Sequence, residues 1–279
     1  MLDKEIQKQL IAKGRDFMHG YRDNDPYESD FESDQDLKLP QPPLVKAPMA
    51  KDGNRIALTK DFSQLPMLHN LPQLIESRRS ARIYTQETMT LEQLSFLLWA
   101  CQGVKSIRGK SYATLRTVPS GGARHPFETY LLIRKVNGLK PGVYHYLPMD
   151  HQLEFLHEIE NLDETVNESL CGQSWAVKAN VLFYWSMVPY RAEWRYGIYA
   201  HRVALMDAGH MAENLYLACT GIGLGCCAIG AFRDELCNKM LTLDGEEEFT
   251  LYVVPVGTVR SCDKAEEQSF YRFVEEEGL

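Results

Sequence analysis

The sequence lacks a hydrophobic run long enough to cross a membrane, because no apolar stretch approaches the roughly 20 residues that a transmembrane helix requires. Its N-terminus, MLDKEIQKQLIAKG, is charged and has no apolar core of the kind found in secretory signals. Positive charge is also scarce, since 30 lysine and arginine residues stand against 38 acidic ones and give a net charge of −8. This balance disfavours binding to nucleic acid through a broad positive field. We therefore expect no membrane and no nucleic acid among the partners.

The sequence also lacks the spacings of common metal and hydrolase sites. None of its seven cysteines forms a C-x-x-C pair, no H-E-x-x-H or similar ligand set occurs, and there is no G-x-S-x-G nucleophile turn. Most of the cysteines lie inside apolar stretches, where a free thiol behaves as a small hydrophobic group. These absences predict no metal site, no serine hydrolase chemistry and a reducing, cytoplasmic location.

The remaining composition is that of a globular protein. The 279 residues are 44% hydrophobic and 24% charged, which suffices for a large core without disulfides. Residues 1–19 are compatible with one short helix, and the text that follows is acidic, rich in proline and almost without periodicity. We predict that residues 1–66 form an N-terminal extension, either an arm on the body or on a partner or a partly disordered segment. Residues 67–279 are predicted to form the body.

Hydrophobic periodicity predicts the main helices and strands of the body. The clearest helix runs from Thr90 to Gly103, since Thr90 and Gln93 have the spacing of a capping box and Gly103 fits the end. A longer helix is predicted from about Tyr199 to Thr220. It is apolar on nearly every side, which favours burial in a core or between subunits. Buried strands are predicted at Thr129–Arg134, Asn180–Trp185 and Leu251–Val256, and a hairpin at Gly142–Tyr146 and Leu153–Leu156.

These elements predict an α+β fold. Strands and helices interleave, but they do not form regular strand–helix–strand units, and the sequence contains no internal repeat. We therefore expect a mostly antiparallel central sheet flanked by helices.

Three guanidinium groups lie within five residues in the segment from Ser77 to Arg82, where Arg78, Arg79 and Arg82 flank Ser80. Such a cluster needs either an anionic partner or open water. The planar donors of arginine match a phosphate group, and the Ser80 hydroxyl adds a further donor. A solvated basic turn is the alternative interpretation of the same residues.

Two glycine-rich segments follow. The loop from Pro119 to Pro126 contains small residues that would let the backbone approach a flat ligand, although an ordinary loop explains them as well. The segment from Gly221 to Gly230 resembles a dinucleotide fingerprint only superficially, because its glycines follow a predicted helix instead of a strand. We predict a helix end, a turn and a short extended piece there.

Taken together and in this order, several segments resemble the FMN-dependent nitroreductase superfamily and, within it, the SagB-type (ThcOx-like) dehydrogenases. The resemblance runs from about Leu71 to Phe273, and the acidic leader that ends at DFSQLP is also similar to that subfamily. The matching text is SRRSAR, LLWACQGV, TVPSGGARHPFETYLL, YHY, WRYGIYAHRVALMDAGHMAENLYLACTGIGLGCCAIGAF and LYVVPVG.

The resemblance implies a nitroreductase-like fold and an intertwined homodimer with FMN at the subunit interface. It implies a cofactor site made of three groups of residues and one C-terminal arginine. The FMN phosphate and ribityl chain would be held by Arg78, Arg79, Ser80 and Arg82; the loop of the partner subunit would contribute Pro119, Ser120, Gly121 and Ala123; the flavin edge would face Ala228, Ile229, Gly230 and Ala231. The family's C-terminal basic ligands fall at Phe270 and Arg272, so Arg272 is the predicted ligand and Arg260 its reserve.

The resemblance also implies an oxidoreductase that moves two electrons or a hydride between flavin and a small conjugated substrate, with NAD(P)H as a candidate reductant. SagB-type relatives oxidise peptide azolines to azoles with the help of a Lys-Tyr pair, which is Arg195-Tyr196 here. Arginine stays protonated, so it suits binding of an anion or polarising of a carbonyl better than proton abstraction. Tyr196 could exchange a proton. Packing or dimer contacts would also explain both residues.

The sequence is also compatible with other functions. The missing lysine and the long leader are compatible with a non-catalytic flavin-binding subunit that needs a partner. A flavin-fragmenting enzyme on the same fold and a phosphate-binding protein without flavin are further alternatives. A peptide azoline dehydrogenase of SagB type is the principal alternative to a reductase of small conjugated molecules.

Overall fold

A computed structural model describes residues 3–19, 31–49, 55–85, 87–260, 268–269 and 271–278. Parts of the predicted extension, at 20–30 and 50–54, lie outside the described residues, as does Phe270, which stands where the family has a basic ligand. In chain order the elements, with η for short 3-10 helices, are α1 (Lys4–Phe17), β1 (Arg55–Ala57), α2 (Leu71–Ser77), α3 (Leu91–Gln102), β2 (Val104–Arg108), β3 (Ala113–Arg116), η1 (Gly121–Ala123), β4 (Phe127–Ile133), β5 (Gly142–Leu147), β6 (Gln152–His157), α4 (Leu162–Ser169), η2 (Ser174–Lys178), β7 (Val181–Met187), α5 (Tyr190–Tyr196), η3 (Gly197–Tyr199), α6 (Ala200–Gly221), β8 (Leu224–Cys226), α7 (Asp234–Leu241), β9 (Phe249–Thr258) and α9 (Arg272–Glu276).

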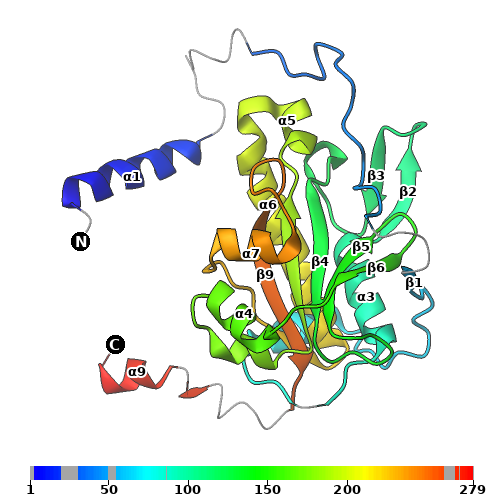
Figure 1. Cartoon of the computed structure of the whole chain (residues 1–279), viewed down its shortest axis with the longest axis vertical. Helices are drawn as coiled ribbons and strands as arrows, with labels where there is room; N and C mark the ends of the chain where they lie inside the picture. The colour runs from blue at the N-terminus through cyan, green and yellow to red at the C-terminus, as the bar shows by residue number, and fades with distance from the viewer. Residues whose placement is uncertain are drawn as a thin grey trace.

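A seven-stranded sheet in the order β1-β6-β5-β4-β7-β9-β8 forms the centre of the molecule (Figure 1). All of its strand pairs are antiparallel. Helices α3 and α6 pack on one face, and α4 and α7 pack on the other. The predicted α+β fold with a mostly antiparallel sheet and flanking helices is therefore confirmed, while the homodimer stays a prediction.

The two central strands β4 and β7 are buried along their whole lengths. Alternate side chains enter separate hydrophobic clusters, so that Leu131 and Phe183 face α6, whereas Leu132 and Tyr184 face α7. A strand covered on both faces needs apolar residues at almost every position. This explains why the sequence reads as continuous hydrophobic runs there, and it confirms the predicted buried strands.

The two predicted helices of the body are present, but one side of the longer helix is exposed. Thr90 caps α3, and its side chain and that of Gln93 form the expected capping box. On α6, Leu205 and Met206 retain 43% and 49% of their accessible surface. Burial on every side is therefore not achieved within one chain. None of the helices in the described ranges is both long enough and apolar enough to cross a bilayer.

Residues 31–49 and 55–57 of the N-terminal extension lie on the sheet and on α5, whereas α1 is exposed along its whole length. β1 adds to the edge strand β6, with Arg55 opposite Glu154, and no feature of the sequence predicted this strand. Farther towards the N-terminus, the amide of Gln35 donates to the Trp194 carbonyl, and the Trp194 indole donates to the Leu39 carbonyl. The division at residue 67 stays a prediction.

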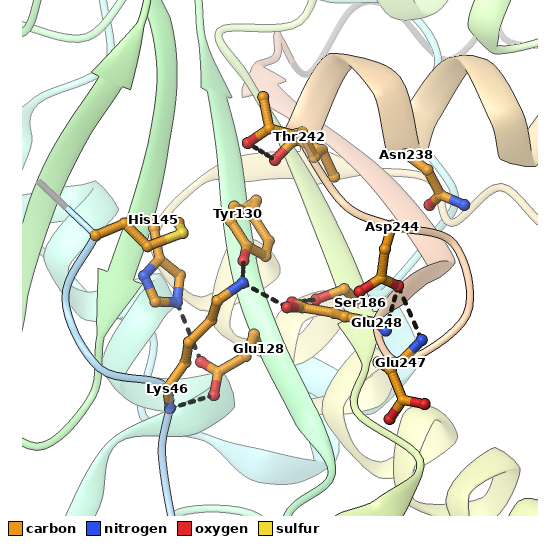
Figure 2. Close-up of polar contacts among 12 residues, drawn as sticks. Lys46, Glu128, Tyr130, His145, Ser186, Asn238, Thr242, Asp244, Glu247 and Glu248 are labelled. Carbon is orange, nitrogen blue, oxygen red and sulfur yellow. Dashed lines mark hydrogen bonds and ion pairs between the residues drawn. The ribbon is translucent and has the colours of Figure 1, made fainter.

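A buried acidic network holds the extension on the sheet (Figure 2). The Glu128 carboxylate accepts from the backbone amide of Lys46 at 2.8 Å, and the Glu154 carboxylate accepts from that of Met49 at 2.9 Å. The Lys46 ammonium lies 2.5 Å from Glu248 and donates to the Tyr130 hydroxyl at 2.8 Å. The extension thus supplies donors to carboxylates that would otherwise be costly to bury.

His145 connects the two carboxylates beneath the extension. Its Nδ1 lies 2.7 Å from Glu154 and its Nε2 lies 3.1 Å from Glu128, and Glu128 also pairs with Arg191 of α5 at 2.5 Å. Burial opposes charge on the imidazole, but hydrogen bonds to both carboxylates outweigh it and raise the pKa of His145. Burial likewise opposes charge on Glu128, yet Arg191 and His145 lower the pKa of that carboxyl.

We expect the Glu128→Gln variant to lose about 3–5 kcal/mol of unfolding free energy at neutral pH, because Arg191 and His145 would be left without their shared anion. Since the folded pKa of Glu128 is lowered, its contribution is present above the ordinary carboxyl range and is lost as the pH falls through and below it. The raised pKa of His145 acts in the opposite sense, so its contribution is complete below its ordinary value and declines as the pH rises through the folded value. Urea unfolding at several pH values measures both effects.

The control is Asp163→Asn, which removes the exposed partner of Arg134 and should cost less than about 1 kcal/mol. Equal destabilisation by the two variants would contradict the importance of the buried network.

Candidate functional site

The arginine segment leaves α2 and runs beside β8. The Ala81 amide donates to the Cys226 carbonyl at 2.9 Å, and Ser80 pairs with Cys226 in a parallel bridge. Ala81 is buried under Gly225, where an added Cβ would lie only 2.6 Å from the Ala81 Cβ. The glycine therefore permits the close approach that fixes the segment.

Tyr216 of α6 joins this segment to the residues after β8. The Arg78 guanidinium lies 5.3 Å from the Tyr216 ring centre, and the Ser80 hydroxyl lies 3.3 Å from the Tyr216 hydroxyl. The Ala228 amide donates to the same hydroxyl at 2.8 Å. Sequence reasoning missed Tyr216, and its only signal was a phenol among the apolar residues near the end of the helix.

Arg82 points to a different set of aromatic residues. Its guanidinium lies 5.9 Å from the Trp175 ring centre and donates to the Tyr271 hydroxyl at 3.0 Å. Tyr271 immediately precedes Arg272, which is exposed on α9. The structure thus places Arg82 beside Tyr271, the residue before the predicted ligand Arg272, while Arg79 is half-buried.

A cavity of about 560 Å³ lies beside Arg82. Its lining includes three cationic side chains, those of Arg82, Lys178 and Arg260, together with the Trp175 ring. None of the described residues that line it is acidic. Because three cations line it, the cavity favours the binding of an anion. The remaining lining residues are Ile83, Tyr84, Ser174 and Val177.

The strip from Ala228 to Ala231 is divided between internal and exposed positions. The Ala228 amide is used by Tyr216, and the Ile229 amide donates to the Val253 carbonyl at 2.7 Å. Gly230 and Ala231 are exposed, and a Cβ added to Gly230 would meet no atom within 4 Å. Open space therefore lies beside the backbone at Gly230.

The glycine loop is fixed to α6 by Asp207. The Ser120 hydroxyl donates to Asp207 at 2.6 Å, and the Gly121 amide donates to the other carboxylate oxygen at 3.1 Å. The Ser120 oxygen in turn accepts from the His125 amide at 2.9 Å. Burial raises the pKa of Asp207, although both donors act to lower it. Sequence reasoning did not identify Asp207, which is one of two carboxylates on α6, the other being Glu213.

Arg195 and Tyr196 pack directly on the same loop. Gly122 has a φ of 54°, and a Cβ there would lie 2.6 Å from Arg195 Cδ and 2.8 Å from the Tyr196 hydroxyl. The two predicted catalytic residues are therefore brought together with Ser120, Gly121 and Ala123, whereas Pro119 is exposed at the start of the loop.

The loop and the arginine segment contact α6 at different levels. Asp207 and Tyr216 are nine residues apart, which corresponds to about 13 Å along a helix axis. Within one chain, the two predicted halves of the cofactor site therefore do not converge on one point of α6. The exposed residues Leu205 and Met206 lie near the level of the loop.

The histidines do not form a metal site. His201 and His210 are exposed, although the helix that carries them was predicted to be buried. Burial lowers the pKa of His125 to about 2, so this loop residue is neutral. In the part of the chain that the structure describes, no three histidine, cysteine or acidic residues are grouped as metal ligands.

Comparisons with known proteins identify one family. The profile of the nitroreductase family matches residues 75–258. Over 200 residues the chain is 34% identical to a nitroreductase-like protein of Methanocaldococcus jannaschii, which covers 70% of this chain and 94% of that protein. It is 29% identical over 150 residues to the microcin B17-processing protein of Escherichia coli, covering 52% of this chain and 54% of that one. A solved nitroreductase-like structure from Ralstonia eutropha matches with a TM-score of 0.61 and 25% identity, covering 80% of this chain and all of that one.

We expect Asp207→Ala to destabilise the protein by about 1–3 kcal/mol, because it leaves the Ser120 hydroxyl and the Gly121 amide without their shared acceptor. Asp207→Asn keeps one acceptor oxygen and should cost less. Denaturant unfolding of the three proteins tests this order. If Asp207→Asn proved as damaging as Asp207→Ala, the carboxylate charge would matter more than the two hydrogen bonds.

Proposed function

The chain belongs to the nitroreductase family, and from this premise we propose that it is an FMN-dependent oxidoreductase. The proposed reaction transfers two electrons, as a hydride, between the flavin and a small conjugated substrate, and NAD(P)H is the proposed reductant. The observation that carries the proposal is the convergence of Arg78, Ser80 and Ala228 on Tyr216. These contacts bring an arginine segment next to a strip of small residues. A cofactor with a phosphate and a flat ring requires both kinds of surface side by side.

The described residues fit the phosphate end of FMN. Arg78 and Ser80 offer charged and neutral donors on one side, and planar guanidinium groups suit the oxygens of a phosphate. Arg82, Lys178 and Arg260 add positive charge around a cavity, and none of its described lining residues is acidic. Arg272, which follows the Arg82 partner Tyr271, is a further proposed ligand. Arg79 is the remaining proposed ligand of this group.

The strip from Ala228 to Ala231 fits the flat end of the cofactor. Open space beside Gly230 would accommodate a ring close to the backbone, and Ile229 is held from behind by β9. When bound there, FMN would supply the electron transfer chemistry. The chain's own contribution is to bind and orient the cofactor and to hold the substrate.

We propose that the site is completed by a second copy of the chain. The loop that contains Pro119, Ser120, Gly121 and Ala123 contacts α6 about two and a half turns from the contact of the arginine segment. In the proposed assembly a second copy therefore brings its loop to each cofactor. The exposed Leu205 and Met206 support association through α6, since large apolar side chains favour burial.

Arg195 and Tyr196 are proposed to face the substrate. Burial alone would lower the pKa of Arg195, but hydrogen bonds with Tyr196 and Tyr112 raise it, so the guanidinium stays charged. A permanent cation can hold an anionic group or polarise a carbonyl of the substrate. Tyr196, whose hydroxyl lies against Gly122, is the proposed residue for proton exchange.

A peptide azoline dehydrogenase of SagB type is the second candidate. The similarity to the microcin B17-processing protein favours it. Arg195 disfavours it, because arginine does not readily accept a proton. Parallel assays with a thiazoline-containing peptide and with a quinone would separate the two candidates, since each predicts turnover of one substrate and not of the other.

We expect the purified protein to be yellow and to release FMN on denaturation. Arg78→Ala should weaken FMN binding about tenfold or more, because a charge-assisted contact to phosphate is removed. Titration of the apoprotein with FMN, followed by fluorescence, measures the affinity. Lys239→Ala removes one exposed positive charge on α7 and serves as the control. A colourless protein that takes up no added FMN would overturn the proposed function.

We expect Arg195→Ala to lower turnover by roughly tenfold while FMN affinity changes less than twofold, since the residue is proposed to contact substrate through charge-assisted bonds. Steady-state kinetics normalised to bound flavin, with quinone and NADH, provide the measurement. Loss of flavin in proportion to activity, with unchanged turnover per flavin, would assign Arg195 to cofactor binding instead.

A further inference from the structure

Two guanidinium groups beside the glycine loop donate to neutral acceptors within the described ranges. Arg124 is buried and donates to the carbonyls of Gly122 and Tyr112, at 3.0 and 2.8 Å. Arg195 donates through Nη1 to the Tyr112 hydroxyl at 2.7 Å and to the Gln35 side-chain oxygen at 3.0 Å. Among the residues that the structure describes, neither arginine forms an ion pair. Positive charge in a partly desolvated position favours the arrival of an anion.

Tyr112 is the centre of this group. The Arg124 guanidinium lies 4.8 Å from the centre of its ring, and its hydroxyl is the nearest partner of Arg195. Gln35 reaches the same hydroxyl through its amide nitrogen at 3.4 Å. Arg195 is therefore held from two directions, by the turn before β3 and by the N-terminal extension.

Three carboxylates near this group in the sequence have other partners. Asp34 accepts from the Tyr190 hydroxyl at 2.8 Å, and Asp36 accepts from the Ser33 hydroxyl at 2.6 Å. Glu193, on the same helix as Arg195, lies 2.7 Å from His201. Asp36 interacts with Arg195 only through space, at more than ion-pair distance, so the positive charge is not neutralised by contact.

We propose that Arg195, positioned by Gln35 and Tyr112, is an oxyanion-binding subsite that receives a carboxylate group of the substrate. This inference rests on the proposed function, because it names the substrate class for the same site. Both hydrogen bonds to the positioning residues run from Nη1, which orients the planar donor fork as a whole. A fixed fork binds a carboxylate more selectively than a flexible point charge does.

The subsite gives the N-terminal extension a direct part in substrate binding. Gln35 belongs to residues 31–49, which the buried acidic network fastens to the sheet through Lys46 and Met49. The backbone of Gln35 is itself bonded to Trp194, the residue before Arg195. The extension and α5 are thus joined at the residue that holds the guanidinium.

The test compares the binding of benzoate and benzamide to the full-length protein with its bound cofactor, by isothermal titration calorimetry. Both probes have one planar ring, and only benzoate carries an oxyanion. We expect the wild-type protein to prefer benzoate roughly tenfold, which is the effect of a charge-assisted hydrogen bond. Gln35→Met, which keeps the length of the side chain but removes its acceptor, should weaken benzoate binding about fivefold and leave benzamide binding unchanged.

Two further variants show whether benzoate binding depends on the orientation of the guanidinium group, on its charge alone, or on the general stability of the protein. Arg195→Lys keeps the charge but not the fork, so it should retain only part of the preference for benzoate. Tyr190→Phe is the matched control, because it also removes one hydrogen bond between the extension and α5 but does not touch Arg195. Its benzoate affinity should equal that of the wild-type protein. Tyr112→Phe provides a second test of positioning if Gln35→Met does not fold.

The possible outcomes test the subsite, the positioning roles of Gln35 and Tyr112, and the proposed function separately. Equal binding of benzoate and benzamide by the wild-type protein would overturn the subsite. A full preference for benzoate in both Gln35→Met and Tyr112→Phe would overturn the positioning roles. Protein that binds no FMN but prefers benzoate, with loss of that preference in Arg195→Ala, would overturn the proposed function and support the subsite.

Discussion

Two polar side chains of α6 hold the glycine loop and the arginine segment of the candidate site in place. Asp207 fixes the glycine loop through the Ser120 hydroxyl and the Gly121 amide, and Tyr216 fixes the arginine segment and the strip after β8. Both groups are largely buried, where a polar atom without a partner is costly. Each anchor therefore selects one arrangement of the loop that reaches it. The spacing of the anchors along α6 then determines that the two loops stay apart within one chain.

The buried acidic network solves a related problem on the sheet. Glu128 and Glu154 are almost fully buried, and their charges are balanced by Arg191, by His145 and by amides of the N-terminal extension. The network connects three parts of the chain that lie far apart in the sequence. Since Arg191 and Arg195 lie one turn apart on α5, the ion pair that holds the start of this helix also limits the movement of Arg195, the residue proposed to face the substrate. Stability and site geometry thus depend on the same charges.

The sequence predicted those features that depend on local patterns. The capping box of α3, the length of α6 and the buried strands β4 and β7 follow from periodicity and from helix-end residues, and the structure confirms them. The order of short motifs also predicted the family, which the family profile confirms. The roles of the individual site residues stay predictions.

Features that depend on long-range pairing could not be predicted. Arg78 and Arg82 are close in sequence but turn to different aromatic partners, and Tyr216 and Trp175 become neighbours of the segment only after folding. The same holds for Gln35, which lies 160 residues before its partner Arg195. β1 has only three residues and no alternating pattern long enough to read. Its position depends on the backbone of β6, which a local pattern does not contain.

β1 also determines how the sheet ends. Without it, β6 would present unpaired backbone donors and acceptors at the edge of a sheet, and such an edge can accept a strand from another molecule. At the opposite edge, the bridge between Ser80 and Cys226 covers part of β8 in the same way. The first cover, β1, belongs to the N-terminal extension, and the second belongs to the arginine segment of the candidate site. The same segments therefore protect the sheet edges and build the site. A chain shortened to begin after β1 would lose the cover on β6 and also the extension that holds Arg195.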